Sequence, residues 1–393
     1  MAPYRQFRSM AMVFLPICAL LTITYMAFIS FDTSGFQNDQ AQIMKMQKAV
    51  EDEQKPLTTT ALANNTTNVK AAFVVLVRNS ELDDLRSAMR QMEDRFNHRY
   101  NYPWVFLNDA DFSEEFKAKT KGIASGNTFY GKVDDTMWGY PEWIDQDKAS
   151  DTRENMKEVI YGDSESYRHM CRFQSGFFFR HPLMLEYDYY WRVEPGVEFS
   201  CSVDYDPFAL MQEKDMKYGW TISLKEYEET IPTLWNTAKE FMQKYPQHIV
   251  PKDDPGSLLK WVSDDDGETY NLCHFWSNFE IGSIKWLNSP AYLDFFNYLD
   301  QNGGFFYERW GDAPVHSIAA ALLLKKDEVH WFYDHGYFHN PFRQCPREPA
   351  WVADEKCLCN PEDSFDEHWY SCTPKWLELT GKKRTDYLVT TRS

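Results

Sequence analysis

The residues best suited to chemistry gather in one short segment, Tyr270–Ile281. It places His274, Trp276, Asn278 and Glu280 close together, with almost no spacer residues. Aromatic faces stack on the C–H surfaces of sugar rings, while amide and carboxylate groups pair with sugar hydroxyls. Such a density of polar groups among aromatics is unusual for a plain core strand. The segment therefore indicates a binding site for a sugar.

A second candidate, Glu194, follows the hydrophobic run Tyr189–Val193. Pro195 and Gly196 come next and turn the chain. A carboxylate held at the end of a strand can bind a hard divalent cation, which prefers oxygen ligands and bridges to phosphate oxygens. The alternative is an acidic turn residue without a ligand. His339 is open in the same way, since it can ligate a metal or simply cap a loop.

Two further charged residues have two interpretations each. Arg78 follows the apolar run Ala71–Val77, where a guanidinium can hold a phosphate or a base edge, or form a surface salt bridge. Asp312 stands two residues before Pro314 at the start of a helical segment. An N-cap is therefore as good an interpretation of Asp312 as a binding role.

Two acidic runs do not carry a metal site. Asp109 and Asp111 match the Asp-x-Asp pattern of metal-dependent sugar-nucleotide transferases, but they precede a helix near Ser113, which favours a turn and cap. The run Asp264–Asp266 precedes Gly267 and indicates a solvated loop. The chain also lacks Gly-x-Gly-x-x-Gly, P-loop, Gly-x-Ser-x-Gly and His-Glu-x-x-His motifs, which removes the usual NAD, kinase, α/β-hydrolase and zincin classes.

These candidates need a sheet whose strands end near one another. Ala71–Val77 is a continuous apolar run and predicts a strand buried on both faces. A capping box at Ser80–Asp83 and a helix follow, and Tyr102–Asn108 predicts the next strand. This order indicates an open α/β sheet, in which ligands lie at the carboxyl ends of the strands. Further helices are expected at 113–120, 151–186, 233–245, 290–299 and 314–326, and further strands at 189–193 and 217–223.

The N-terminus is expected to cross a membrane. Ser9–Phe31 contains 23 residues without a charge, about the length of a spanning helix. Arg5 and Arg8 precede it and Asp32 follows, so the positive-inside rule leaves residues 1–8 in the cytosol. We expect an uncleaved signal-anchor over residues 9–31. A cleaved signal peptide is the alternative, but the run is long for one and no clear Ala-x-Ala site follows.

Residues 32–68 have the composition of a stem, rich in Gln, Asn, Asp, Thr and Lys. Asn64 and Asn65 head two overlapping Asn-x-Thr sequons, which are the only ones in the chain. In a lumenal stem either is a candidate glycosylation site. Residues 69–393 then form the folded lumenal domain.

Charge and cysteine content set further limits. The chain carries 41 Lys and Arg against 59 Asp and Glu, a net charge of −18, which argues against a nucleic-acid partner. An oxidising compartment would permit disulfides among the cysteines outside the apolar run. Their number is odd, so at least one thiol stays free or pairs between chains. Zinc is a weak interpretation of Cys357-Leu358-Cys359, because the spacing is not that of a zinc finger. These seven cysteines are Cys171, Cys201, Cys273, Cys345, Cys357, Cys359 and Cys372.

Several segments together resemble the fungal Golgi α-1,2-mannosyltransferase family typified by yeast, glycosyltransferase family 15. The resemblance covers about Val69 to Trp376, in order, and blocks such as Tyr-Asn-Leu-Cys-His-Phe-Trp-Ser-Asn-Phe-Glu are highly specific. The signal-anchor and stem also match the family's type II layout. The segments that carry it are 77–80, 93–97, 167–176, 191–197, 270–281, 309–316 and 357–372.

The resemblance implies a GT-A-like α/β fold, an open mixed sheet flanked by helices, with GDP-mannose as donor and Mn²⁺ as cofactor. It implies Glu194 and His339 as the Mn²⁺ ligands. Glu-Pro replaces the usual Asp-x-Asp in this family, and this chain keeps it. Arg78 would lie at the nucleotide.

The resemblance also assigns roles around the reacting sugar. Glu280 is the candidate nucleophile, and Tyr167 would lie by the donor phosphates and the reacting centre. Trp276 and Asp312 would line the donor–acceptor site, with Asn278 beside them. Retention of configuration needs either a covalent carboxylate intermediate or front-face attack through an oxocarbenium-like state. The sequence leaves this choice open.

The expected protein is thus a Golgi type II membrane enzyme that elongates N-linked or O-linked glycans of glycoproteins. It would move mannose from GDP-mannose to the 2-hydroxyl of an acceptor mannoside and would be held to the membrane through residues 9–31. One alternative is a mannosylphosphate transferase of the same family. Another is a lumenal mannan-binding protein without catalysis.

Overall fold

A computed structural model describes residues 69–349 and 356–389, and these belong to one compact unit, Thr66–Ser393. Among those residues no helix is both long and apolar enough to span a bilayer. The expected cytosolic tail, signal-anchor, stem and the sequons at Asn64 and Asn65 lie outside the described residues.

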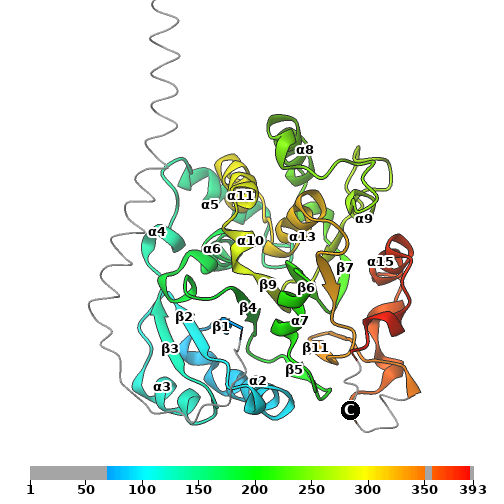
Figure 1. The fold of residues 1–393 in the computed structure, drawn as a ribbon. Coiled ribbons are helices and arrows are strands. Elements are labelled where there is room, and N and C mark those ends of the chain that lie inside the picture. The colour runs from blue at the N-terminus through cyan, green and yellow to red at the C-terminus, as the bar shows by residue number, and fades with distance from the viewer. Residues whose placement is uncertain (1–68, 350–355, 390–393) are drawn as a thin grey trace, which may run out of the picture. The chain divides into compact units, whose positions relative to one another are not determined.

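The unit is built on a mixed sheet of seven strands in the order β10-β6-β9-β4-β1-β2-β3 (Figure 1). Six strands run in one direction, and β9 alone runs antiparallel to its neighbours β4 and β6. The amino end of β9 therefore lies at the same edge as the carboxyl ends of the others. The strands are β1 (Ala71–Leu76), β2 (Trp104–Asn108), β3 (Thr128–Lys132), β4 (Tyr189–Arg192), β6 (Tyr218–Trp220), β9 (Glu280–Ser283) and β10 (Val329–Trp331).

Helices cover both faces of this sheet. Along β1 the side chains alternate, and Phe73 and Val75 join Met89 and Phe208 in one buried cluster. That face is covered by α2 (Leu82–Arg95), α3 (Glu114–Lys121) and α7 (Pro207–Glu213), of which α2 and α3 lie at the bottom of Figure 1. The apolar run of β1 is thus buried on both sides, as its sequence predicts.

On the opposite face, His316 of α13 (Asp312–Leu323) contacts Glu280 and Tyr218 of the sheet. The helices α6 (Glu165–Gly176) and α11 (Pro290–Asn302) pack against α13 and against each other. These helices approach closely, because a Cβ on Gly176 would lie 2.0 Å from the ring of Phe296. The Tyr292 hydroxyl donates to the carbonyl of Ser175 at 2.8 Å. The remaining helices are α4 (Asp135–Trp138), α5 (Gln146–Asn155), α8 (Leu234–Lys244), α9 (Leu259–Val262), α10 (Ile284–Leu287), α12 (Gly304–Tyr307) and α15 (Thr373–Thr380).

Two small sheets extend from the carboxyl edge. One joins β5 (Glu198–Phe199), β11 (Tyr337–His339) and β12 (Phe342–Arg343) in the order β12-β11-β5. The other pairs β7 (Ser223–Lys225) with β8 (Cys273–Phe275). The first brings His339 next to the segment that follows β4, and the second leads the chain into β9.

Three disulfides tie the C-terminal segment to this framework. They are Cys201–Cys357, Cys273–Cys372 and Cys345–Cys359. Cys171 stays a free, buried thiol, which agrees with the odd number of cysteines. The sulfurs of Cys201, Cys357 and Cys359 lie together, but disulfides account for all three, so they offer no zinc site.

Several expected elements differ from the structure. Residues 151–186 are largely helical, as expected, but the helix is interrupted: α5 and α6 are separate, and Ser164 caps α6 by accepting from the amide of Tyr167. Residues 217–223 form two strands, β6 and the start of β7, in different sheets. The capping box is shifted, since Glu81 accepts from the amide of Arg78 at 2.7 Å. The helices at 113–120, 233–245, 290–299 and 314–326 are confirmed to within a few residues.

Candidate active site

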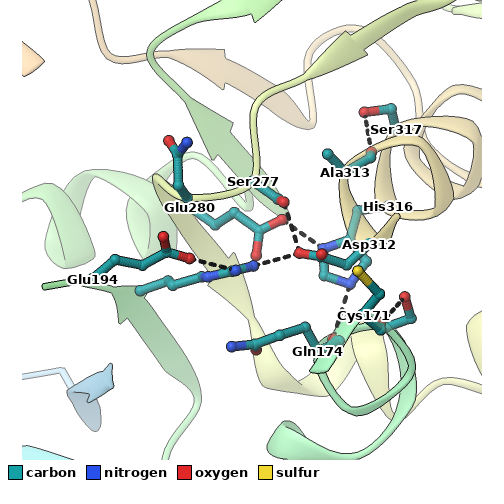
Figure 2. A network of polar contacts seen from close by, with 12 residues as sticks. Cys171, Gln174, Glu194, Ser277, Glu280, Asp312, Ala313, His316 and Ser317 are labelled. Carbon is teal, nitrogen blue, oxygen red and sulfur yellow. Dashed lines mark hydrogen bonds and ion pairs between the residues drawn. The ribbon is translucent and has the colours of Figure 1, made fainter. Parts of the chain in front are cut away.

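The carboxyl end of β4 and the amino end of β9 lie side by side at the centre of the sheet. Arg192 is paired in register with Glu280, the first residue of β9. Glu194 follows β4 after one residue, and Asp312, the first residue of α13, lies opposite Glu194 (Figure 2). Four charged side chains therefore meet here: Arg192, Glu280 and Asp312 are buried, and Glu194 is partly exposed.

Arg192 organises these charges. Its guanidinium donates to Glu194 at 2.5 Å and, through its other terminal nitrogen, to Asp312 at 2.6 Å. The hydroxyl of Ser277 donates to the same Asp312 oxygen at 2.7 Å. Asp312 is thus not only a residue of the first helical turn, because its carboxylate faces the site. A buried ion pair of this kind holds its side chains in place, because moving or removing one partner leaves the other charge buried and unpaired.

This arrangement keeps both carboxylates ionised. Burial alone would raise the pKa of Glu194, but the charge of Arg192, with help from His339, lowers it to about 2. Burial likewise opposes ionisation of Asp312, and Arg192 again outweighs it and lowers the pKa. At neutral pH the site therefore offers a fixed pair of anionic oxygens around one cation.

Glu280 is completely buried, and hydrogen bonds occupy both of its oxygens. Oε1 accepts from the hydroxyl of Tyr218 at 2.7 Å and lies 2.5 Å from Nδ1 of His316. Oε2 accepts from the hydroxyl of Tyr190 at 3.2 Å. The carboxylate is held by three donors from β4, β6 and α13.

The opposite nitrogen of His316 also meets an acceptor, the carbonyl of Gln174 at 3.2 Å (Figure 2). With an acceptor at each ring nitrogen, the doubly protonated imidazolium satisfies both. Burial lowers the pKa of His316, but the charge of Glu280 raises it by more than burial lowers it, so the net shift of the pKa is upward. His316 and Glu280 therefore form a buried ion pair.

Gly282 makes this arrangement possible. It pairs in register with Tyr190, and a Cβ at this position would lie 2.6 Å from the Tyr190 ring and 2.8 Å from its hydroxyl. A methyl group there would displace the ring that reaches Glu280. The glycine is required for space and not for an unusual backbone conformation.

The residues expected to hold the metal come together. Oε2 of Glu194 lies 3.6 Å from Nε2 of His339, and both side chains are partly exposed. Nδ1 of His339 lies 3.1 Å from the carbonyl of Asn340, so a proton on Nδ1 leaves Nε2 free to ligate. One carboxylate oxygen and one imidazole nitrogen suit Mn²⁺. The residues present therefore fit the cation that the sequence leads us to expect.

Aromatic and amide groups border this pair. The ring of Trp276 lies edge-on to that of His339, with centroids 4.7 Å apart. Asn278 is buried, and its carbonyl and side-chain oxygens both accept from the hydroxyl of Tyr337 at 3.1 Å. Trp276 stays partly exposed and is the more available of the two to a ligand.

Arg78 and Tyr167 form a second group at the start of α6. Arg78 donates to the hydroxyl of Ser166 at 2.5 Å, which joins the end of β1 to this helix. The guanidinium of Arg309 lies 5.2 Å from the ring centre of Tyr167, and Tyr161 stacks on that ring at 4.7 Å. Burial raises the pKa of the Tyr167 phenol well above its usual value, so the phenol remains a donor.

The two rejected acidic runs are indeed loops. Asp109 and Asp111 are exposed in the turn between β2 and α3, where the carbonyl of Asp111 accepts from Asn79. Asp265 accepts from Ser263 and Thr269 within its own loop.

Sequence reasoning missed Arg192, His316, Tyr190 and Tyr218. A signal existed for Arg192, because it is the only charge inside the otherwise apolar run Tyr189–Val193 and needs a buried partner. His316 is similarly isolated at the start of an apolar helix. The two tyrosines had no such signal, since tyrosine is common in strands.

Comparison with known proteins agrees with this site. The family described as glycolipid 2-alpha-mannosyltransferase matches residues 32–381. The chain is 54% identical over 318 residues to glycolipid 2-alpha-mannosyltransferase 2 of Candida albicans, covering 80% of this chain and 68% of that protein. It is 54% identical over 312 residues to alpha-1,2 mannosyltransferase KTR1 of Saccharomyces cerevisiae, covering 79% and 78%.

A solved structure is similar as well. Core-mannan synthase A (CmsA/Ktr4) from Aspergillus fumigatus, crystallised in an Mn/GDP form, is 39% identical with a TM-score of 0.75. The match covers 82% of this chain and 88% of that one. The architecture is the expected GT-A-like α/β fold with a mixed sheet. The chain therefore belongs to glycosyltransferase family 15 and is an enzyme of the α-1,2-mannosyltransferase class.

Proposed function

We propose that the protein transfers mannose from GDP-mannose to the 2-hydroxyl of an acceptor mannoside, with retention of configuration and with Mn²⁺ as cofactor. One observation carries the proposal: Glu194, fixed by Arg192, lies 3.6 Å from His339 at the carboxyl edge of the sheet. This is where open α/β sheets bind nucleotides. Trp276 beside the pair provides a surface for a sugar ring.

Each side chain has a role in this reaction. Glu194 and His339 would hold the cation, and Arg192 keeps Glu194 turned towards His339. Mn²⁺, when bound, supplies the positive charge that stabilises the departing diphosphate. Tyr167 remains a neutral phenol and can donate to a phosphate oxygen. Arg78 extends this positive and donating surface towards the nucleotide.

The state of Glu280 favours one of the two retaining mechanisms. A nucleophile must reach the anomeric carbon, whereas Glu280 is fully buried and both its oxygens are engaged. We infer that it forms no bond to the sugar and that its carboxylate, held in place by Tyr190, Tyr218 and His316, stabilises an oxocarbenium-like centre electrostatically during front-face attack. Covalent attack is the alternative and would require these hydrogen bonds to break.

The wild-type assay tests the function directly. The full-length protein is incubated with GDP-mannose, Mn²⁺ and methyl α-mannoside, and the product linkage is determined. A 1,2-linked disaccharide is expected, and its formation should stop when the metal is chelated. A product carrying mannose phosphate would identify a mannosylphosphate transferase. No product and no response to metal would identify a binding protein.

Glu280→Gln tests the role of Glu280. The amide removes the charge and points an N–H group at donors, so transfer is expected to fall at least about a hundredfold. Both mechanisms predict this loss. The two mechanisms differ in whether the wild-type enzyme becomes covalently mannosylated when it is incubated with GDP-mannose and no acceptor. Intact-protein mass spectrometry measures this. Front-face attack predicts no mannosylated enzyme. Full activity of Glu280→Gln would remove Glu280 from the mechanism.

We also propose the location and acceptors. Residues 9–31 would anchor the protein in the Golgi membrane as a type II protein, with residues 32–68 as stem and residues 69–393 in the lumen. The acceptors would be mannose-containing N-linked or O-linked glycans of glycoproteins. Supporting this are the 23 uncharged residues of the anchor and the three disulfides, which form in an oxidising compartment.

A further inference from the structure

A cavity of about 570 Å³ lies against the hairpin that carries His339. Phe338 and Phe342 flank His339 along the chain and line the cavity. The other wall comes from the C-terminal segment, including Phe365 and His368. The volume is within the range of small-molecule binding sites. None of the roles proposed above uses this cavity.

An aromatic track leads from the active site along this cavity. The ring centres of Trp276 and Phe342 are 5.7 Å apart, and those of Phe342 and Phe365 are 4.1 Å apart. Phe365 lies 5.1 Å from His368, which lies 5.4 Å from Trp369. The aromatic track consists of Trp276, Phe342, Phe365, His368 and Trp369.

The outer end of the track is exposed and firmly held. Trp369 is 79% exposed, so the face of its indole is open to a sugar ring. The neighbouring backbone is fixed, because Cys372 donates to the carbonyl of Ser223 and is bonded to Cys273. The amide of Lys225 donates to the carbonyl of Tyr370. The indole is therefore presented on a rigid turn, as a preformed binding surface requires.

The polar residues of the cavity favour a neutral ligand over an anionic one. Arg343 is paired with Glu198 at 2.7 Å, and Arg347 with Glu367 at 2.9 Å. Glu362 and Asp363 add further carboxylates to the wall. These carboxylates repel phosphate, and the guanidinium groups already have carboxylate partners, while both kinds of group can hydrogen-bond to sugar hydroxyls.

We propose that the cavity and the aromatic track bind the neutral sugar units that precede the acceptor mannose in an oligosaccharide. Trp276 would contact the unit that receives the new mannose, and Trp369 would stack on a unit further along the glycan. The subsite rests on the proposed transfer to mannosides and adds to it a preference for acceptors longer than one sugar. Such a subsite would raise kcat/KM for oligosaccharides over a monosaccharide.

The test compares methyl α-mannoside with a linear neutral α-linked mannotriose as acceptors for the full-length protein. The wild type is expected to prefer mannotriose. Trp369→Ala should reduce the ratio of the two kcat/KM values about threefold to tenfold, the equivalent of one aromatic contact. Trp369→Tyr keeps a flat ring and should restore most of the ratio. A phosphorylated mannotriose should be a poorer acceptor than the neutral one.

Trp143→Ala is the matched control, because Trp143 is 50% exposed and packs near Asp300, outside the cavity. It should leave the ratio unchanged. An equal ratio in the wild type and Trp369→Ala, or equal kcat/KM for both acceptors in the wild type, overturns the subsite alone. Absence of any transfer by the wild type overturns the proposed function and the subsite with it.

Discussion

At the scale of single residues, the site depends on one guanidinium shared by two carboxylates. Arg192 reaches Glu194 and Asp312 with separate nitrogens, which a lysine ammonium could not do in the same geometry. The cation that the family uses would then meet a carboxylate already oriented and ionised. The affinity for Mn²⁺ should therefore depend on Glu194 and His339. It should not depend on Asp109 and Asp111, although their spacing matches a metal motif.

Glu194→Ala and His339→Ala should each weaken Mn²⁺ binding at least about tenfold, because each removes one of two protein ligands. Titration of the protein with Mn²⁺, followed by electron paramagnetic resonance, measures this without any turnover. The double variant Asp109→Asn and Asp111→Asn is the control and should bind Mn²⁺ like the wild type. Normal binding by both alanine variants would place the metal elsewhere.

The ion pair of His316 and Glu280 predicts a pH-dependent stability. Glu280 raises the folded-state pKa of His316 above its unfolded value near 6.5, so the contribution is full below that pH. It is lost as the pH rises through the raised folded-state value. Relative to His316→Gln, the wild type should be more stable by about 3 kcal/mol near pH 6. The difference should be smaller at a pH well above 6.5.

Urea unfolding at both pH values measures the two free energies. His248→Gln is the control, because the pair of His248 with Asp294 is less buried and should contribute about 1 kcal/mol or less. A difference between wild type and His316→Gln that does not change with pH would contradict an imidazolium at this position.

At the scale of elements, the sequence predicts the helices and strands that can be recognised from their own residues alone. β1 and β2 are continuous apolar runs, and α3 begins at a Ser113 cap that accepts from Phe116 at 3.1 Å. β9 was not predicted, because Glu-Ile-Gly-Ser has neither alternation nor strong strand propensity and is held by its two neighbours. Local signals do not report such tertiary pairing.

The same distinction applies to the site. Glu194 could be predicted, since a strand and a Pro-Gly turn mark its position. The role of Arg192 could not be predicted in full, because its partner Asp312 is 120 residues away. The family resemblance supplied His339 and Tyr167, which local pattern alone leaves ambiguous.

The disulfide between Cys273 and Cys372 links β8 to the start of α15 across 99 residues. Replacing both cysteines by alanine should lower the free energy of unfolding by about 4 kcal/mol, since a long loop gains entropy in the unfolded chain. The midpoint temperature of thermal unfolding of the wild type should fall when a reductant is added. Cys171→Ala removes the free thiol and is the control. Its midpoint temperature should fall with reductant as that of the wild type does. A wild type that reductant leaves unchanged would exclude a stabilising role.

At the scale of the whole molecule, anchoring and catalysis should separate. The described unit has its own core and disulfides, and all the site residues discussed above lie within it. A secreted form that lacks residues 1–31 and carries a signal peptide should keep its kcat/KM within about twofold. The full-length protein fused to a fluorescent protein should co-localise with a Golgi marker, while the shortened form should appear in the medium. Retention of the shortened form in the cell would contradict the anchor.

The reversed direction of β9 also limits which length changes the turn before it can accept. Three residues separate Trp276 from Glu280. Losing one of them would shift the strand by one position and exchange the two faces. Ile281 would then come to lie beside Arg192, and the carboxylate would enter the apolar layer against α2. The register of β9 thus fixes the residue count of this turn, in addition to the contacts that Ser277 and Asn278 make with Asp312 and Tyr337.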